Sequence, residues 1–512
     1  MKDKFDSLNQ YTDPFSKHVR ELSAKFDLAT TNKDTQKIKE LFIVAENSLD
    51  GENSSSQAML YYSLGTAYDN YAKITGNRNE AALKKILYYF RKSIKLIELY
   101  EYDDKCAPYL LGLKELLYTN YANVLDYCGR KIAAIEQYKK ALSIHRKFGM
   151  ALGNLGLVYQ HYGILEYDDN HKDLFHYFAY HYLNNAIHSN DPNTFDTAKK
   201  GFKKAMGMYM PEYVEKVLTQ ELSFEQYVYD NPEELAYRKW CLHNNLFLNT
   251  LNDLPVAELS FAADVIQLPD MIARKDDKPI FHGMFSQLKQ EYIYARYIYY
   301  STLNSDCAPH FADKETYITA YIDYAQFSIR LERLKTAFKT LYGMFDKIAF
   351  FLEHYFDLGI KERDISFRSI WQNSAGYGKK KYKYKNTLDS NKNFALSSLY
   401  WISKDFFEKF EDSPNPELER IRNIRNSLEH KYVKITDDFF ENQVEGRGDG
   451  LALYISEGEL YDATFMLLKI LREAIICLSL CVNIAEKPKK EAIKDKIILP
   501  IHLINYEDDW KI

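Results

Sequence analysis

A short pattern of large and small residues recurs in the N-terminal part of the chain. Its instances are Leu64-Gly65 with Tyr68, Tyr121-Ala122 with Leu125, and Leu155-Gly156 with Tyr159, and the last two lie 34 residues apart (121 to 155). In the following segments a large residue stands three positions before a small one, as Phe90/Ser93, Tyr138/Ala141 and Leu183/Ala186. Small residues let two helices approach closely, and the large residue fills the space beside them. The pattern therefore predicts stacked helical hairpins.

The 34-residue period resembles the tetratricopeptide repeat (TPR). We expect roughly three to five TPR-like hairpins over about residues 20–210, with degenerate hairpins at the ends. The larger step of 57 residues, from 68 to 125, predicts an insertion near residues 97–117. Such an array offers a concave surface to a protein, a peptide or a small ligand. The alternative is an irregular helical array that only packs on the rest of the chain.

Residues that interrupt helices are scarce, since the chain of 512 residues has only 20 Gly and 13 Pro. This scarcity argues against an all-β protein. The predicted fold class is all-α, a TPR-like helical array followed by a C-terminal helical bundle. The expected domains are the TPR-like region over residues 1–210, a helical connector over 211–275, the bundle over 276–490 and a tail over 491–512.

Long helices are predicted in the C-terminal half, where apolar residues recur at three- to four-residue spacing. Ser456 and Glu459 form a capping-box pattern that marks the start of the last of these helices. The predicted helices cover residues 285–300, 316–356 with a break or bend near Gly343, 393–409, a stretch beginning at 414–416, and 457–485.

The N-terminus has no apolar stretch typical of a secretory signal, and the most apolar run, residues 474–485, is too short to cross a bilayer. The six cysteines include no C-x-x-C pair, which argues against a disulfide scaffold or a zinc ribbon. We therefore expect a cytoplasmic protein without a membrane segment, a metal site or a cofactor.

One polar segment of the predicted bundle, Ile421 to His430, contains Arg425 and His430 in an R-x4-H arrangement with Asn426 directly after the arginine. This arrangement resembles the motif of the HEPN superfamily, helical-bundle proteins of which many are metal-independent ribonucleases. Other stretches resemble one bacterial HEPN family that carries TPR-like repeats upstream; they are residues 240–242, 248–254, 289–296 and 345–349. The resemblance covers about residues 230–485. It implies RNA as the substrate, a homodimer formed through the HEPN bundle, and a role in toxin or antiphage defence.

The residue types of the motif fit RNA cleavage without a metal, in which the 2′-OH of the RNA attacks the adjacent phosphate. His430 can move protons near neutral pH, and the planar guanidinium of Arg425 can pair with phosphate oxygens. Asn426 lies four residues before His430 and can orient the imidazole or the substrate. Arg422, on the same helical row, is a second candidate phosphate contact. The alternative is a solvated helix face, on which Glu429 pairs with Arg425.

Arg425 and His430 are five residues apart, which corresponds to about 140° around an ideal helix. Either the helix ends or bends before His430, or two copies of the motif share one site. The resemblance favours the second arrangement, because HEPN ribonucleases typically pair as dimers. Glu291 and Arg296, on an early helix of the bundle, are candidate polar groups that support the site from behind.

A basic run follows Gly376-Tyr377-Gly378 in a chain whose net charge is −5. Lysines in such a run neutralise phosphates, and tyrosines between them can stack on unpaired bases. The alternative is a solvated loop between bundle helices. The candidate RNA-binding residues of this run are Lys379, Lys380, Lys381, Tyr382, Lys383, Tyr384 and Lys385.

Two functions remain open at this point. The first is a metal-independent endoribonuclease effector, in which the TPR-like region is a sensor or regulator. The second is a non-catalytic TPR regulator or scaffold that binds a peptide, a protein or nucleic acid. The absence of a phosphate-binding loop pattern does not support ATP hydrolysis.

Overall fold

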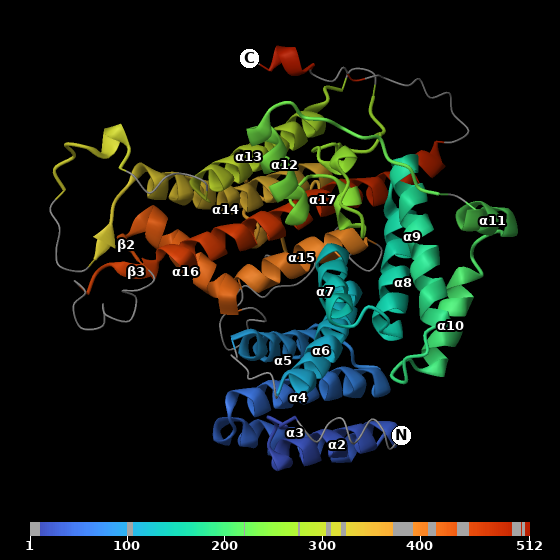
Figure 1. The fold of residues 1–512 in the computed structure, drawn as a ribbon. Helices are drawn as coiled ribbons and strands as arrows, with labels where there is room; N and C mark the ends of the chain where they lie inside the picture. The colour runs from blue at the N-terminus through green and yellow to red at the C-terminus, as the bar shows by residue number, and fades with distance from the viewer. Residues whose placement is uncertain are drawn as a thin grey trace.

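The computed structural model describes residues 11–99, 106–219, 221–274, 277–303, 309–318, 324–371, 393–407, 416–437, 450–493, 503 and 507–511. Nearly all of its regular structure is α-helical, and one small sheet of three short strands is the exception. The predicted all-α fold class is thus confirmed. Figure 1 shows a helical array that runs below a bundle of longer helices and then up one side of it.

The N-terminal array consists of consecutive helices, of which the first eight pack as antiparallel pairs. Their bounds are α2 Lys17–Thr31, α3 Thr35–Ser48, α4 Ser54–Ile74, α5 Glu80–Leu99, α6 Ala107–Tyr127, α7 Lys131–Ile144, α8 Gly149–Leu165, α9 Asp169–Ile187, α10 Asp196–Met206 and α11 Pro211–Thr219. The pairs are α2 with α3, α4 with α5, α6 with α7, and α8 with α9. Helical hairpins are therefore present, and their assignment to the TPR family stays a prediction.

Close packing within the hairpins involves the small residues of the recurring pattern. A methyl group on Gly65 in α4 would lie 2.8 Å from Phe90 Cε1 in α5, and one on Gly156 in α8 would lie 2.9 Å from Leu183 Cγ in α9. Ala122 is fully buried. The prediction that small residues permit close helix approach, with a large residue beside them, is confirmed at Gly65 and Gly156.

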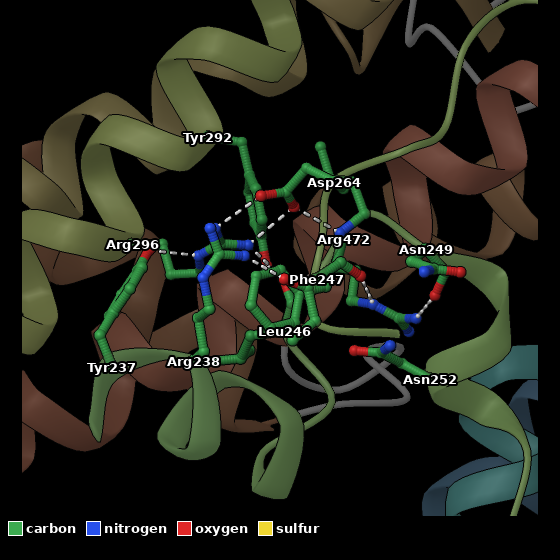
Figure 2. A network of polar contacts seen from close by, with 12 residues as sticks. Tyr237, Arg238, Leu246, Phe247, Asn249, Asn252, Asp264, Tyr292, Arg296 and Arg472 are labelled. Atoms are coloured by element: carbon green, nitrogen blue, oxygen red, sulfur yellow. Dashed lines mark hydrogen bonds and ion pairs between the residues drawn. The ribbon is translucent and has the colours of Figure 1, made fainter. Parts of the chain in front are cut away.

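The connector is helical only in part. After α11 the described chain contains α12 (Pro232–His243) and two single 3-10 turns, Thr250–Asp253 and Leu259–Phe261. Two buried arginines of the bundle hold the irregular remainder (Figure 2). Arg472 donates from Nε to Phe247 O at 2.6 Å and from Nη2 to Asn249 O at 2.8 Å, which satisfies backbone groups that no helix or sheet satisfies.

The bundle contains α13 (Ile280–Leu303), α14 (Ile329–Phe356), α15 (Phe394–Phe407), α16 (Pro416–His430) and α17 (Glu457–Ala492). Ser456 caps α17 by accepting a hydrogen bond from Glu459 N at 3.1 Å, as the capping-box pattern predicted. The predicted start of α14 and the predicted break in it were wrong. This helix starts at Ile329 rather than near 316, and it continues without a break through Gly343.

A three-stranded sheet, absent from the sequence prediction, follows the end of α16. Its strands are β1 (Ala325–Gln326), β2 (Val433–Thr436) and β3 (Leu453–Ser456), in the order β1-β2-β3. β2 is antiparallel to β1 and parallel to β3, with Val433 opposite Leu453. The sheet thus ties the residues after α16 to the start of α17.

The array and the bundle meet through a buried network of charged side chains. The carboxylate of Asp405 in α15 accepts hydrogen bonds from Arg91 Nη1 at 2.8 Å and from Arg130 Nη1 at 2.8 Å. Arg130 also donates from Nη2 to Glu473 Oε2 of α17 at 2.7 Å. Charges buried this deeply are stable only when paired, so these contacts connect the two parts of the chain firmly. Among the described helices, none combines the length and the apolar character that a membrane span requires.

Candidate active site on helix α16

Helix α16 carries the R-x4-H motif and packs on the bundle through apolar residues at helical spacing. Leu418, Ile421 and Ile424 are buried against α14 and α15. Because these residues recur every three or four positions, the polar residues between them lie on the flanks of the helix or face solvent. Arg422, Arg425 and Asn426 are half-buried, whereas His430 is exposed.

Arg425 lies over an aromatic ring of the neighbouring helix. Its guanidinium carbon is 5.3 Å from the centroid of Tyr342, a buried residue of α14. Its Nη1 donates a hydrogen bond of 3.2 Å to Asn426 Oδ1. A cation over an aromatic face is attracted by the ring quadrupole. Tyr342 and Asn426 therefore define where the guanidinium lies, and the hydrogen bond of Arg425 goes to Asn426 rather than to Glu429.

Arg422 lies one turn before Asn426 and contacts a third helix. Its Nη1 donates to the carbonyl oxygen of Phe406 in α15 at 3.3 Å, and its Nη2 donates to Glu419 Oε1 at the same distance. Burial raises the pKa of Tyr342 to about 12, while the positive charges of Arg425 and Arg422 act in the opposite direction. Both arginines therefore place positive charge near this ring.

His430 is the last residue of α16, and the helix continues without interruption up to it. The alternative that the helix ends before His430 is therefore wrong. Because they are five residues apart on this helix, Arg425 and His430 project about 140° apart. A single copy does not direct both side chains at one point.

A cation and two aromatic rings lie just beyond His430, where no sequence pattern had indicated a site. Lys434 of β2 is buried, and its Nζ is 5.3 Å from the ring centroid of Tyr432 and 5.6 Å from that of Tyr454 in β3. Tyr432 itself is exposed. Tyr342 was missed as well, because nothing in the local sequence links it to a motif on another helix.

Arg296 and Glu291 have partners away from α16. Arg296 donates from Nη2 to Asp264 Oδ2 at 2.7 Å and from Nε to the hydroxyl of Tyr237 at 2.8 Å (Figure 2). Glu291 accepts a hydrogen bond from Lys347 of α14. Among the described residues, no hydrogen bond or ion pair joins either side chain to α16, so the predicted support of the motif is not seen there. Arg296 instead holds the connector on α13.

The basic run of residues 379–385, with its lysines and tyrosines, lies outside the described residues. Within the described part of the chain, no three His, Cys, Asp or Glu side chains gather in a way that could hold a metal ion.

Comparison with known proteins identifies the part of the chain that carries this motif. Residues 272–485 match the family described as LA2681-like HEPN. No curated protein and no solved structure matches the chain. The match begins just before α13 and ends within α17, so it contains the whole described bundle up to that point, including Arg425, Asn426 and His430. Residues 272–485 thus carry a HEPN domain of the LA2681-like type.

Proposed function

We propose that this protein is a metal-independent endoribonuclease whose active site contains Arg425, Asn426 and His430. The observation that carries the proposal is the position of the motif inside the HEPN domain. There the guanidinium of Arg425 is held on Tyr342 at 5.3 Å, and the imidazole of His430 is exposed at the end of α16. Phosphate binding needs an ordered cation, and proton transfer needs an accessible group that titrates near neutral pH.

In the proposed reaction the 2′-OH of a ribose loses its proton to an imidazole and attacks the adjacent phosphorus. The bond from phosphorus to the 5′-oxygen breaks, and this oxygen takes a proton as it leaves. The products are a 2′,3′-cyclic phosphate and a 5′-OH end. The guanidinium of Arg425 stabilises the negative charge that develops on the non-bridging oxygens, and His430 moves the proton.

Two copies of the chain complete the proposed site. Since Arg425 and His430 are five residues apart on one continuous helix and project from different sides of it, a two-fold arrangement of two α16 helices is the simplest way to direct both groups at one phosphate. We propose a homodimer formed through the HEPN bundle. The array is then the regulatory part of a defence or toxin effector, because unrestrained RNA cleavage would harm the cell that makes the protein.

The proposal is tested by incubating the purified protein with total RNA in the presence of EDTA. We expect cleavage by the wild type, and a loss of about a hundredfold or more in His430→Ala and in Arg425→Ala. Asn423→Ala is the matched control, because Asn423 is exposed on the same helix and lies outside the proposed site. Cleavage that survives both motif substitutions, or that is absent from the wild type, would contradict the assignment and favour a non-catalytic regulator.

The chemistry of the RNA ends provides a separate check. Mass spectrometry of the products should find 2′,3′-cyclic phosphate and 5′-OH ends. A 3′-OH end would exclude attack by the 2′-OH, even if the motif substitutions abolish cleavage.

We also propose that Lys379, Lys380, Lys381, Lys383 and Lys385, with Tyr382 and Tyr384, bind the RNA strand. Replacing the five lysines with serine should weaken RNA binding and reduce its dependence on salt, because fewer counterions are released from the phosphates. Binding titrations at several salt concentrations measure both effects, and an unchanged salt slope would exclude this role.

A further inference from the structure

The array contains a cavity that the proposed RNA-cleaving site does not use. It has a volume of about 250 Å³ and lies between α2, α4 and α6, the first helices of three successive hairpins. Figure 1 shows α2 and α4 at the bottom of the molecule, with α6 next along the array. Its described lining residues lie between 15 and 116, outside the HEPN domain of residues 272–485.

The walls of the cavity are mostly aromatic and aliphatic. They share one face of each helix, because the lining positions recur at three- and four-residue spacing. The apolar lining residues are Phe15, Phe26, Met59, Tyr62, Ala67, Tyr109, Leu113 and Leu116. Leu116 is 37% exposed, which indicates that this part of the lining reaches the surface. The polar lining consists of Ser23, Asp27, Thr30, Ser63, Thr66 and Asn70.

Asp27, an exposed residue of α2, is the charged residue of this lining, and no Lys, Arg or His is among the described residues that line the cavity. Partial burial raises the pKa of its carboxyl group, with no basic neighbour to oppose the effect. The Asp27 carboxylate also adds to the rise in the pKa of the buried Tyr62 phenol, to about 12, which is caused mainly by burial. No basic residue among the described lining provides a counter-charge for this carboxylate.

These features decide between classes of ligand. A nucleotide or another phosphate is excluded, because an anion would meet a carboxylate and no cation. A guanidinium group fits, since it pairs with a carboxylate through two hydrogen bonds and stacks on aromatic rings. The volume of about 250 Å³ is below the range of about 300–1,000 Å³ for pockets that hold drug-sized ligands. The cavity thus suits a single long side chain.

We propose that the cavity binds the side chain of an arginine from a peptide segment that lies along the array, with its guanidinium on Asp27 and its stem between the aromatic walls. An arginine stem contributes apolar contact while its head keeps a charged partner. The array then binds a basic peptide, and this assignment does not depend on whether the HEPN domain cleaves RNA.

The test uses the full-length protein and the blocked peptide acetyl-Leu-Arg-Leu-amide, with binding measured by saturation-transfer NMR and titration. The matched probe replaces arginine with citrulline, which has nearly the same shape and no charge. We expect Asp27→Asn to weaken binding of the arginine peptide about tenfold, the effect of one charge-assisted hydrogen bond. The citrulline peptide should bind the wild type about as weakly as the arginine peptide binds Asp27→Asn.

Asp50→Asn is the control variant, because Asp50 is exposed and lies outside the lining, and it should bind the arginine peptide like the wild type. Equal binding of the arginine and citrulline peptides, equal affinity of Asp27→Asn and wild type, or no binding of either peptide would each overturn the proposal. Agmatine carries the guanidinium without a peptide. If it binds as tightly as the arginine peptide, the cavity takes a free small cation and the peptide assignment is wrong.

Discussion

Arg425 owes its position to a residue of another helix. The ring of Tyr342 lies under the guanidinium at 5.3 Å, and Phe406 packs edge-on against that ring with centroids 5.7 Å apart. A flexible arginine held in this way loses less side-chain entropy when it binds a phosphate. Tyr342 is therefore a positioning residue of the proposed active site.

Replacing Tyr342 with leucine should lower kcat/KM for RNA cleavage by about two- to thirtyfold, which corresponds to a cation–π interaction of about 0.5–2 kcal/mol. Tyr342→Phe keeps the ring and should retain most of the activity. Steady-state kinetics on one oligoribonucleotide measures the effect, with thermal unfolding as a check on folding. A loss of similar size in both variants would contradict a role for the ring face and point to the hydroxyl.

Glu166 is a buried acid at the junction of α8 with the connector. Burial raises its pKa to about 8, a hydrogen bond from Thr250 opposes this rise, and the charges of Asp168 and Asp253 add to it. His171 Nδ1 is 3.8 Å from Glu166 Oε2. Because the folded-state pKa is above the unfolded one, the folded state binds the proton more tightly. The stability that Glu166 contributes is thus complete below about pH 4.5 and is lost as the pH rises through about 8.

Glu166→Gln should remove this pH dependence, because glutamine has no proton to lose. We expect the variant to be more stable than the wild type at pH 8, on the order of a few kcal/mol, with the difference shrinking toward pH 5. Urea unfolding at both pH values measures it. A constant difference between variant and wild type across this range would show that Glu166 does not titrate there.

At the scale of helices, some glycines are required because a neighbouring helix leaves no room for a side chain, and others are not. A methyl group on Gly65 would lie 2.8 Å from Phe90 Cε1, whereas one on Gly112 in α6 would meet nothing within 4 Å. The two glycines therefore form a matched pair, one at a helix contact and one on an exposed helix face.

Gly65→Ala should destabilise the protein by about 1–2 kcal/mol, because the overlap with Phe90 exceeds the gain in helix propensity. Gly112→Ala should stabilise it by about 0.5–1 kcal/mol. Chemical denaturation of both variants measures these changes. An equal gain in both would mean that α4 and α5 can separate without cost.

Helix prediction succeeded where the pattern was local. The starts of α16 and α17 follow from Pro416 and from the Ser456 cap, since both features act within one helical turn. The start of α14 was placed too early, and the sheet was missed. Its strands are two to four residues long and are joined by pairings between distant parts of the chain. A pattern confined to one segment does not reveal such pairings.

At the scale of the whole molecule, the array and the bundle depend on each other. Asp405 accepts hydrogen bonds from Arg91 and Arg130. Its neighbour Phe406 accepts one from Arg422 of the candidate site. A substitution at the junction between the array and the bundle therefore affects α15 next to the residue that contacts Arg422.

Asp405→Asn should destabilise the protein by about 3–5 kcal/mol, because it leaves two buried arginines without one of their carboxylates. Glu40→Gln breaks the exposed Lys37–Glu40 pair and should leave stability nearly unchanged, because solvent screens this pair. Denaturant unfolding compares the two. A small effect of Asp405→Asn would show that water or a neighbouring group replaces the lost charge.

Residue order along the chain was enough to predict a helical fold, the recurring pattern of the array and the R-x4-H motif, because helix periodicity, caps and motif spacing are local properties. It did not indicate that Tyr342 lies under Arg425, that Arg296 holds the connector rather than the motif, or that Asp27 faces a cavity without a counter-charge. These relations join residues that are distant along the chain or on separate helices. They arise from how the helices pack, since packing sets which side chains meet, which charges lose water and which must find a partner.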